Sequence, residues 1–314
     1  MQRVTRDRIS YAFDRRLEPA LRVRPGEEFE VETEDARSGR CRAAEQCRPE
    51  YVKALRSGNH YYGNPVTGPV FVEGARPGDA LAVHVRNVEC DSQGFLCYWP
   101  FVYHLSDWLR EPVTELVAIR DGHVEHTLQT ASGPHALRLP LRPMIGCLGT
   151  APELEVPTTS SAGRFGGNLD VPEVASGTTA YFPVDVPGGL LFLGDCHPYQ
   201  GDGEVSGCEM RAVLRVAVDV IPGGRRSRYG VRIETPTHLV TVGADRPAES
   251  AQWLAIREMI LWLEERYGWT KEDARKLLTL TGDLRPGQIQ VGPYTMRMIV
   301  PKGHLPAKSD QLNS

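Results

Sequence analysis

The feature that most constrains the fold is a plan of two apolar strands joined by a Pro-Gly turn, which occurs three times before residue 200. In residues 21–35 (LRVRPGEEFEVETED), Phe29 and Val31 alternate with glutamates after the turn. Residues 70–89 repeat the plan around Pro77-Gly78, and residues 180–197 repeat it again. From residue 17 to about 240 the chain is therefore predicted to form short strands.

Two further segments support a mainly β fold. Residues 117–129 predict a hairpin on the Asp121-Gly122 turn, and residues 212–224 alternate as one strand. The segments VFVEGARPGDALAVHV and YFPVDVPGGLLFLGDC share one order of features about 110 residues apart, which favours two related β units that arose by duplication.

The pattern changes after residue 245, where two helices are predicted. In the first, Trp253, Ile256, Ile260 and Leu263 are expected to face the core, with Glu258 mostly off that face. The second begins at Thr270 as N-cap. A strand over 289–301 follows. We expect three parts: 1–150 as an N-terminal β unit, 151–245 as a second β unit with the site, and 246–314 as a C-terminal α/β segment.

Composition excludes several classes of function. The 314 residues carry a formal net charge of −4, which gives no reason to expect nucleic acid or a membrane as partner. The basic residues Arg225, Arg226 and Arg228 are interpreted as a solvated loop. The N-terminus lacks the apolar stretch of a signal peptide, and no apolar run approaches the roughly 20 residues of a membrane helix. Seven cysteines without metal-knuckle spacing indicate reduced thiols in a cytoplasmic protein.

One stretch, GDCHPYQGDGEVSG (194–207), combines acidic, histidine and cysteine residues at the end of an apolar strand. Side chains alternate along a strand, so Asp195 and His197 would share a face, and Asp202 and Glu204 would do so beyond the loop. Two such pairs could surround calcium, magnesium, manganese or zinc. Alternatively, Asp202-Gly203 is a hairpin turn with solvated carboxylates.

Two other polar segments contain residues that could bind a metal ion. In GRFGGNLD (163–170), two glycines allow close backbone approach, and Asn168 and Asp170 again lie two residues apart. In HVEH (123–126), the two histidines follow a turn on opposite strand faces and are interpreted as exposed hairpin residues.

Nucleophilic mechanisms have less support. The sequence has no G-x-S-x-G elbow and no nucleotide-binding glycine pattern. A thiolate at Cys196 or Cys208, activated by His197, is conceivable, although buried inert thiols are commoner in β cores.

The chain resembles the acetamidase/formamidase family of amidases over nearly its whole length. The matching segments are RVRPGEEFEVETEDA, NPVTGPVFVEGARPGDALAV, MIGCLGTAPE, GGNLD, GDCHPYQGDGEVSG and ETPTHLVTVG. The resemblance implies hydrolysis of short aliphatic amides to a carboxylate and ammonia. It also implies β-sandwich and barrel-like units with an α/β appendage, a bound divalent metal and a homo-oligomer, which would also cover exposed sheet edges.

Carried over by position, the family's cluster falls on six polar residues: Asn168, Asp170, Asp195, His197, Asp202 and Glu204. Phe165 departs from the pattern, because relatives often carry histidine just before the Gly-Gly-Asn. We therefore expect His197, Asp195, Asn168 and Asp170 to hold the metal, with zinc or calcium favoured.

Amide hydrolysis also needs a general base and hydrogen-bond donors to the oxyanion. Glu204 is expected to act as general base, with Asp202 as a second catalytic carboxylate. The backbone N–H groups of Gly166 and Gly167 are expected to donate hydrogen bonds to the oxyanion. The alternatives are a thiol-dependent amidase, a metal-binding β-sandwich protein acting on another small polar ligand, and a purely structural cation site.

Overall fold

The computed structural model describes residues 1–57, 63–100, 105–223 and 227–306, and these are mainly β, as predicted. Arg225 and Arg226 lie outside the described residues. The strands are β1 (Gln2–Val4), β2 (Ile9–Ser10), β3 (Leu21–Val23), β4 (Glu28–Glu32), β5 (Val66–Val72), β6 (Ala80–Tyr98), β7 (Val113–Arg120), β8 (His123–Thr130), β9 (Gly133–Pro140), β10 (Met144–Thr150), β11 (Ala162–Gly163), β12 (Gly166–Asn168), β13 (Thr178–Pro183), β14 (Leu191–His197), β15 (Gly207–Ile221), β16 (Gly230–Glu234), β17 (His238–Asp245), β18 (Asp283–Pro286) and β19 (Tyr294–Pro301). The α-helices are α1 (Pro49–Ser57), α2 (Ala248–Tyr267) and α3 (Lys271–Thr281), and 3-10 turns cover Ala44–Cys47 and Lys302–His304.

The sheet is built on β6 and β15, which pair antiparallel over most of their length. Both are much longer than the short strands expected, and their register shifts at Met210/Ala212 and Arg215/Val216. Such irregularities bend a strand and increase its twist, so one long strand can serve two parts of a curled sheet. The other edge of β15 pairs with β4, which buries Phe29 and Val31 as the alternation predicted.

The two segments whose sequences share the strand, Pro-Gly turn and strand order lie side by side, and their strands pair with each other. β5 pairs antiparallel with β14, and β6 pairs antiparallel with β13, so each strand of one unit lies beside the opposite strand of the other. The connecting turns also touch, since Gly78 N donates to Val184 O and Gly188 N donates to Ala75 O. This arrangement is compatible with duplication, which stays a prediction, as does the division into three parts.

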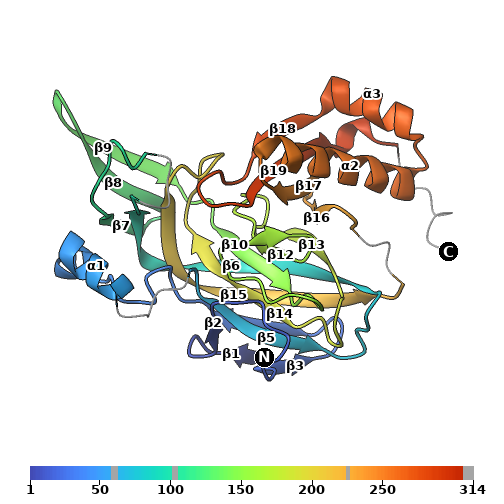
Figure 1. The fold of residues 1–314 in the computed structure, drawn as a ribbon, viewed down its shortest axis with the longest axis horizontal. Coiled ribbons are helices and arrows are strands. Elements are labelled where there is room, and N and C mark those ends of the chain that lie inside the picture. The colour runs from blue at the N-terminus through green and yellow to red at the C-terminus, as the bar shows by residue number, and fades with distance from the viewer. Residues whose placement is uncertain (58–62, 101–104, 224–226, 307–314) are drawn as a thin grey trace.

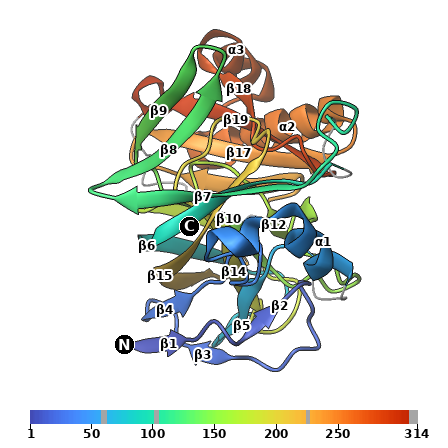
Figure 2. The same cartoon turned by 90° about the vertical axis from the view of Figure 1, so that its left-hand side faces the viewer.

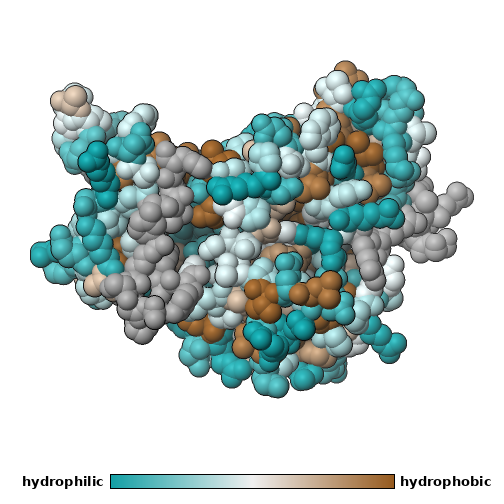
Figure 3. Space-filling model, viewed as in Figure 1, coloured by the Kyte–Doolittle hydropathy of each residue, from teal (hydrophilic) through white to brown (hydrophobic). Residues whose placement is uncertain are grey.

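Two projections rise from the sheet on opposite sides of a concave rim (Figures 1 and 3). One is the β8–β9 hairpin, which follows the predicted Asp121-Gly122 turn between β7 and β8. The other is the α2–α3 pair. After a 90° turn, the N-terminal strands β1 to β5 lie at the end of the molecule opposite these helices (Figure 2).

The C-terminal helices begin where expected, and three of the four predicted core positions of α2 pack inward: Leu263 is buried, and Ile256 and Ile260 pack against the same apolar cluster. Thr270 caps α3 by accepting a hydrogen bond from Asp273 N (3.1 Å). On α2, however, Trp253 is 59% exposed and Glu258 is fully buried, so the predicted core face was wrong at both positions. Periodicity failed here because Arg232 of β16 bonds to Glu258, which makes a charged position part of the interior.

Helix α1 was not anticipated, since its nine residues follow a polar, cysteine-containing segment. All seven cysteines are free, in agreement with the expected reduced thiols. Among the described residues, no helix has the length and apolar character needed to span a membrane.

Candidate metal centre

Four acidic residues meet around one histidine in the interior of the sheet. Asp195 and His197 share a face at the end of β14, as strand alternation predicted, and Asp170 follows β12. Glu204 comes from the loop after β14, and Glu209 comes from β15. Each of the five residues is at most 4% exposed. The cluster therefore joins two strands and two loops in a site closed to solvent.

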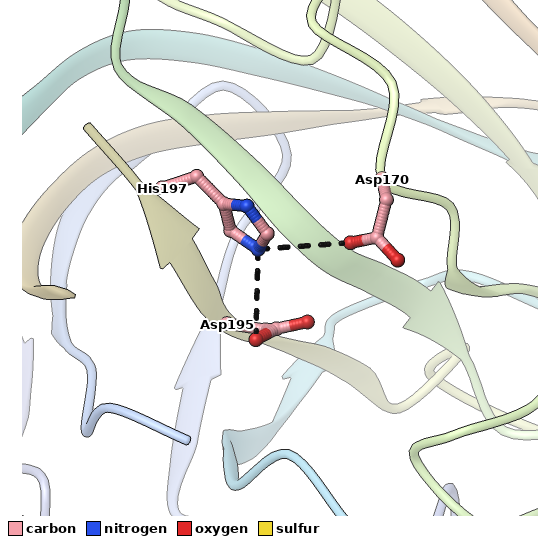
Figure 4. Close-up of side chains that lie close together, drawn as sticks. All are labelled: Asp170, Asp195 and His197. Atoms are coloured by element: carbon pink, nitrogen blue, oxygen red, sulfur yellow. Dashed lines mark ion pairs between the residues drawn. The ribbon is translucent and has the colours of Figure 1, made fainter. Parts of the chain in front are cut away.

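Three carboxylates surround Nε2 of His197 at similar distances. Glu209 Oε2 lies 3.6 Å away, Asp195 Oδ1 3.7 Å and Asp170 Oδ1 3.8 Å. Figure 4 shows the two aspartates approaching this nitrogen from different sides. These separations exceed those of hydrogen bonds, but ligands of a tetrahedral zinc site lie roughly 3.4 Å apart around the ion. The spacing suits ligands around a cation better than direct pairing.

The inward-facing atoms of the cluster have no hydrogen-bond partner. They comprise both ring nitrogens of His197 and one oxygen each of Asp170, Asp195, Glu204 and Glu209. Buried polar atoms are almost always paired, and an unpaired buried charge costs several kcal/mol. Six such atoms in one place are typical of a site that binds a ligand accepting electron pairs.

Backbone conformation at the cluster is also unusual. Asp170, Asp195 and Glu204 have φ of 47°, 56° and 39°, in the left-handed region that residues with a Cβ rarely adopt. Gly146 of β10 lies so close that a Cβ there would come within 2.5 Å of Asp170 Oδ1. Glycine is required at this position for the aspartates to approach. Strained residues of this kind concentrate at functional sites.

The electrostatics show how poorly the protein alone balances these charges. Burial and the neighbouring Asp195 raise the pKa of Asp170 to about 7. Burial, together with Asp170 and Asp195, raises the pKa of Glu204 well above its usual range, and burial and Asp195 do the same for Glu209. Burial alone would lower the pKa of His197, but Asp195 and Asp170 outweigh it and raise that pKa. A divalent cation would relieve this repulsion.

The donor set fits a divalent metal ion. One imidazole with several carboxylates matches the ligands of zinc, and the oxygen-rich remainder also suits calcium. Two overlapping groups have ligand atoms close enough to share an ion: Asp170, Asp195 and His197, and His197, Glu204 and Glu209. Because His197 belongs to both groups, the ion would lie beside this ring.

Asp202 is not part of the cluster. Its carboxylate is 35% exposed and pairs with Arg297 and, at 3.3 Å, with Arg285. The loop between β14 and β15 is not a strand here, and positive φ at Gly203 and Glu204 turns the side chains of Asp202 and Glu204 apart. The predicted catalytic role of Asp202 stays a prediction.

Gly166 and Gly167 lie in β12, which pairs on one side with β10 and on the other with β11. Their φ values of 100° and 98° require glycine, and a Cβ on Gly167 would come within 2.1 Å of Ser161 O. Phe165 before them packs edge-on against Phe13 in an apolar cluster. The oxyanion role of the two glycines also stays a prediction.

Asn168 touches the cluster from outside. Its Nδ2 donates to Asp170 Oδ2 (2.6 Å), while its Oδ1 accepts from Asn64 Nδ2 (3.0 Å) and lies 3.0 Å from Cys147 Sγ. Asn64 Nδ2 is also 2.5 Å from Asp195 Oδ2.

The thiols singled out in the sequence lie away from these atoms. Cys196 contacts Thr33 Oγ1 at 3.6 Å because it alternates with Asp195 and His197 along β14. Burial raises the pKa of Cys196 and of Cys208 to about 12. His123 and His126 lie on the β8 hairpin as predicted, where His126 pairs with Glu115 (3.0 Å), but both are half-buried and not exposed as expected.

Sequence reasoning missed Glu209, Asn64 and Cys147. Glu209 depends on strand pairing: Cys196 pairs with Met210 in antiparallel register, which puts Glu209 beside His197 on the same face, and the sequence alone does not give this register. Asn64 and Cys147 lie far from the polar loop in sequence, and each is a common residue of turns or cores.

Comparison with known proteins agrees with the resemblance seen in the sequence. Residues 6–164 and 155–300 match the model of the Acetamidase/Formamidase family. A formamidase of Methylophilus methylotrophus is 28% identical over 67% of this chain and 63% of its own length, and an acetamidase of Mycolicibacterium smegmatis is 26% identical over 75% and 70%. The chain thus spans less than two thirds of the formamidase.

Solved structures agree over the whole chain. The crystal structure of an acetamidase from Bacillus halodurans superposes with a TM-score of 0.84 and 33% identity, covering 96% of this chain and 98% of its own. A predicted acetamidase/formamidase from Thermoanaerobacter tengcongensis gives 0.84 and 30%, covering 96% of each chain. The chain therefore belongs to the Acetamidase/Formamidase family.

Proposed function

We propose that the protein is an amidohydrolase that cleaves short aliphatic amides, such as formamide and acetamide, to a carboxylate and ammonia. Relatives named formamidase and acetamidase support the reaction class. The observation that carries the site assignment is the set of six unpartnered buried atoms around His197. We propose His197, Asp195 and Asp170 as metal ligands, and add Glu209, whose Oε2 is the nearest of these carboxylate oxygens to Nε2.

Each group then has a distinct task. A bound divalent cation would polarise the amide carbonyl and acidify a water molecule. Glu204 takes a proton from the attacking water and passes one to the departing nitrogen. Its Oε2 has no hydrogen-bond partner, which leaves this oxygen available to accept and release the proton. The closed site keeps bulk water from competing with these contacts.

Ammonia release from formamide, acetamide and longer amides tests the proposal. The cation-free protein should be inactive and should regain activity with zinc or calcium, which also identifies the metal. Release from none of these amides, at any metal loading, would contradict the short-amide assignment and favour a different small polar ligand. A structural cation would leave hydrolysis unchanged after its removal.

A thiol mechanism makes a different prediction. The pKa of about 12 at Cys196 and Cys208 leaves little thiolate at neutral pH, which disfavours both as nucleophiles. Activity should persist in Cys196→Ser and Cys208→Ser chains and disappear with a chelator. Inactivation by iodoacetamide that a chelator does not reproduce would instead support the thiol. A homo-oligomer and a cytoplasmic location stay predictions.

A further inference from the structure

We propose that Asn64 and Asn168 form an amide pair that fixes which carboxylate oxygens face the cation. The proposal rests on the proposed metal site and assigns Asn64 as a positioning residue. Asn168, expected from the sequence to be a ligand, takes the same positioning role.

In each of the two aspartates, one carboxylate oxygen accepts a hydrogen bond from an asparagine and the other does not. On Asp195, Oδ2 accepts a hydrogen bond from Asn64 (2.5 Å), whereas Oδ1 has no partner and lies 3.7 Å from His197 Nε2. On Asp170, Oδ2 accepts from Asn168 (2.6 Å), whereas Oδ1 has no partner and lies 3.8 Å from the same nitrogen. Each carboxylate thus has one oxygen held by an amide and one turned toward the imidazole.

A single chain of hydrogen bonds links the two carboxylates. Asn64 Nδ2 contacts both Asp195 Oδ2 and Asn168 Oδ1, and Asn168 Nδ2 then donates to Asp170 Oδ2. The thiol of Cys147 adds contacts of 3.0 Å to Asn168 Oδ1 and 3.4 Å to Asp195 Oδ2. Two neighbours, Asn64 and Cys147, therefore already contact Asn168 Oδ1.

This arrangement has a consequence for cation binding. Aspartate carboxylates rotate about their Cβ–Cγ bonds, and the four carboxylates of this buried cluster repel one another. An amide that holds the outer oxygen stops this rotation, so the inner oxygens are in place before the cation arrives. Hydrogen-bond partners of metal ligands typically contribute 10- to 100-fold in affinity.

The test compares Asn64→Ala with Asn87→Ala. Asn87 is also half-buried, but lies on β6 opposite Arg215, away from the cluster. Cation-free chains are titrated with Zn²⁺ and, separately, Ca²⁺ by calorimetry. We expect about 10- to 100-fold weaker binding in Asn64→Ala and no change in Asn87→Ala.

The outcomes separate this inference from the proposed function. Equal affinity in the wild-type and Asn64→Ala chains would overturn the positioning role alone. No cation binding by the wild-type chain would overturn both. If the alanine chain does not fold, Asn64→Ser, which removes the same amide and keeps a small polar side chain, is read in the same way.

Discussion

Two regions of this molecule hold carboxylates in its interior, and they differ in how the negative charge is balanced. Around Glu258, the protein supplies its own partners: Arg232 Nε bonds to Glu258 Oε1 (2.6 Å), and the N–H groups of Arg228 and Tyr229 bond to Oε2. Nearby, the carboxylate of Glu234 accepts hydrogen bonds from Arg266 and Lys302. No arginine or lysine pairs with the carboxylates around His197 among the described residues.

The difference separates a structural role from a functional one. A carboxylate matched by the chain's own donors anchors α2 to β16 and needs nothing from solution. Carboxylates left unmatched lower stability and persist when a ligand compensates them. Burial of acidic residues alone therefore does not mark a site; burial without an internal partner does.

The largest expected effect is on chemistry. Glu204→Gln should lower amide hydrolysis by about 10²- to 10⁴-fold, because the proposed proton acceptor is lost while the shape is kept. The cation-free variant should be at least as stable as the wild type, since one of four repelling carboxyl groups is gone. Ammonia release and chemical unfolding measure the two effects.

Asp202→Asn is the matched control, in the same loop but ion-paired to Arg297 outside the cluster. We expect a loss of activity below about 10-fold. A loss of activity as large as that of Glu204→Gln would support the predicted catalytic role of Asp202.

The opposite pattern is expected at the second region. Glu258→Ala should lower the free energy of unfolding by about 3–5 kcal/mol, because it leaves Arg232 buried without its main partner. The folded fraction should keep the wild-type kcat. Glu265→Ala, on the more exposed side of Arg232, should cost no more than about 1 kcal/mol. Similar losses for the two variants would contradict the importance of burial.

Cation removal should distinguish the regions directly. At a cation concentration 100 times Kd, binding stabilises the fold by about 2.7 kcal/mol, and a chelator should remove this increment. Thermal unfolding with and without chelator measures it. The increment should survive in Glu258→Ala and disappear in Asp195→Asn; its persistence in the latter would place the cation elsewhere.

The smallest effect concerns acid stability. Burial opposes ionisation of Glu234, but Arg266 and Lys302 outweigh it and lower its pKa from 4.5 to about 2. A lowered pKa stabilises the fold above the unfolded value, and this contribution is lost as pH falls from about 4.5 to 2. We expect about 1–2 kcal/mol after screening by solvent. Unfolding of wild type and Glu234→Gln should differ at pH 6 and converge near pH 2; a constant difference would contradict the assignment.

The sequence predicted those parts of the site that follow from local geometry. Asp195 and His197 meet because strand side chains alternate, and Asp170 was found through the glycines before it. Asp202 and Glu204 separate because two positive φ angles break the alternation in their loop. Glu209 depended on pairing between β14 and β15, and Asn64 lies 131 residues from its partner Asp195, a contact that no local pattern encodes.

The pairing of β4 with β15 has a consequence for how the chain folds during synthesis. Phe29 lies opposite Val216, so an early strand must wait for nearly two hundred further residues before one of its edges is covered. Contacts of such long range slow folding and leave apolar strands open to association with other chains. The nascent protein is therefore expected to need protection, by chaperones or low concentration, until β15 has left the ribosome.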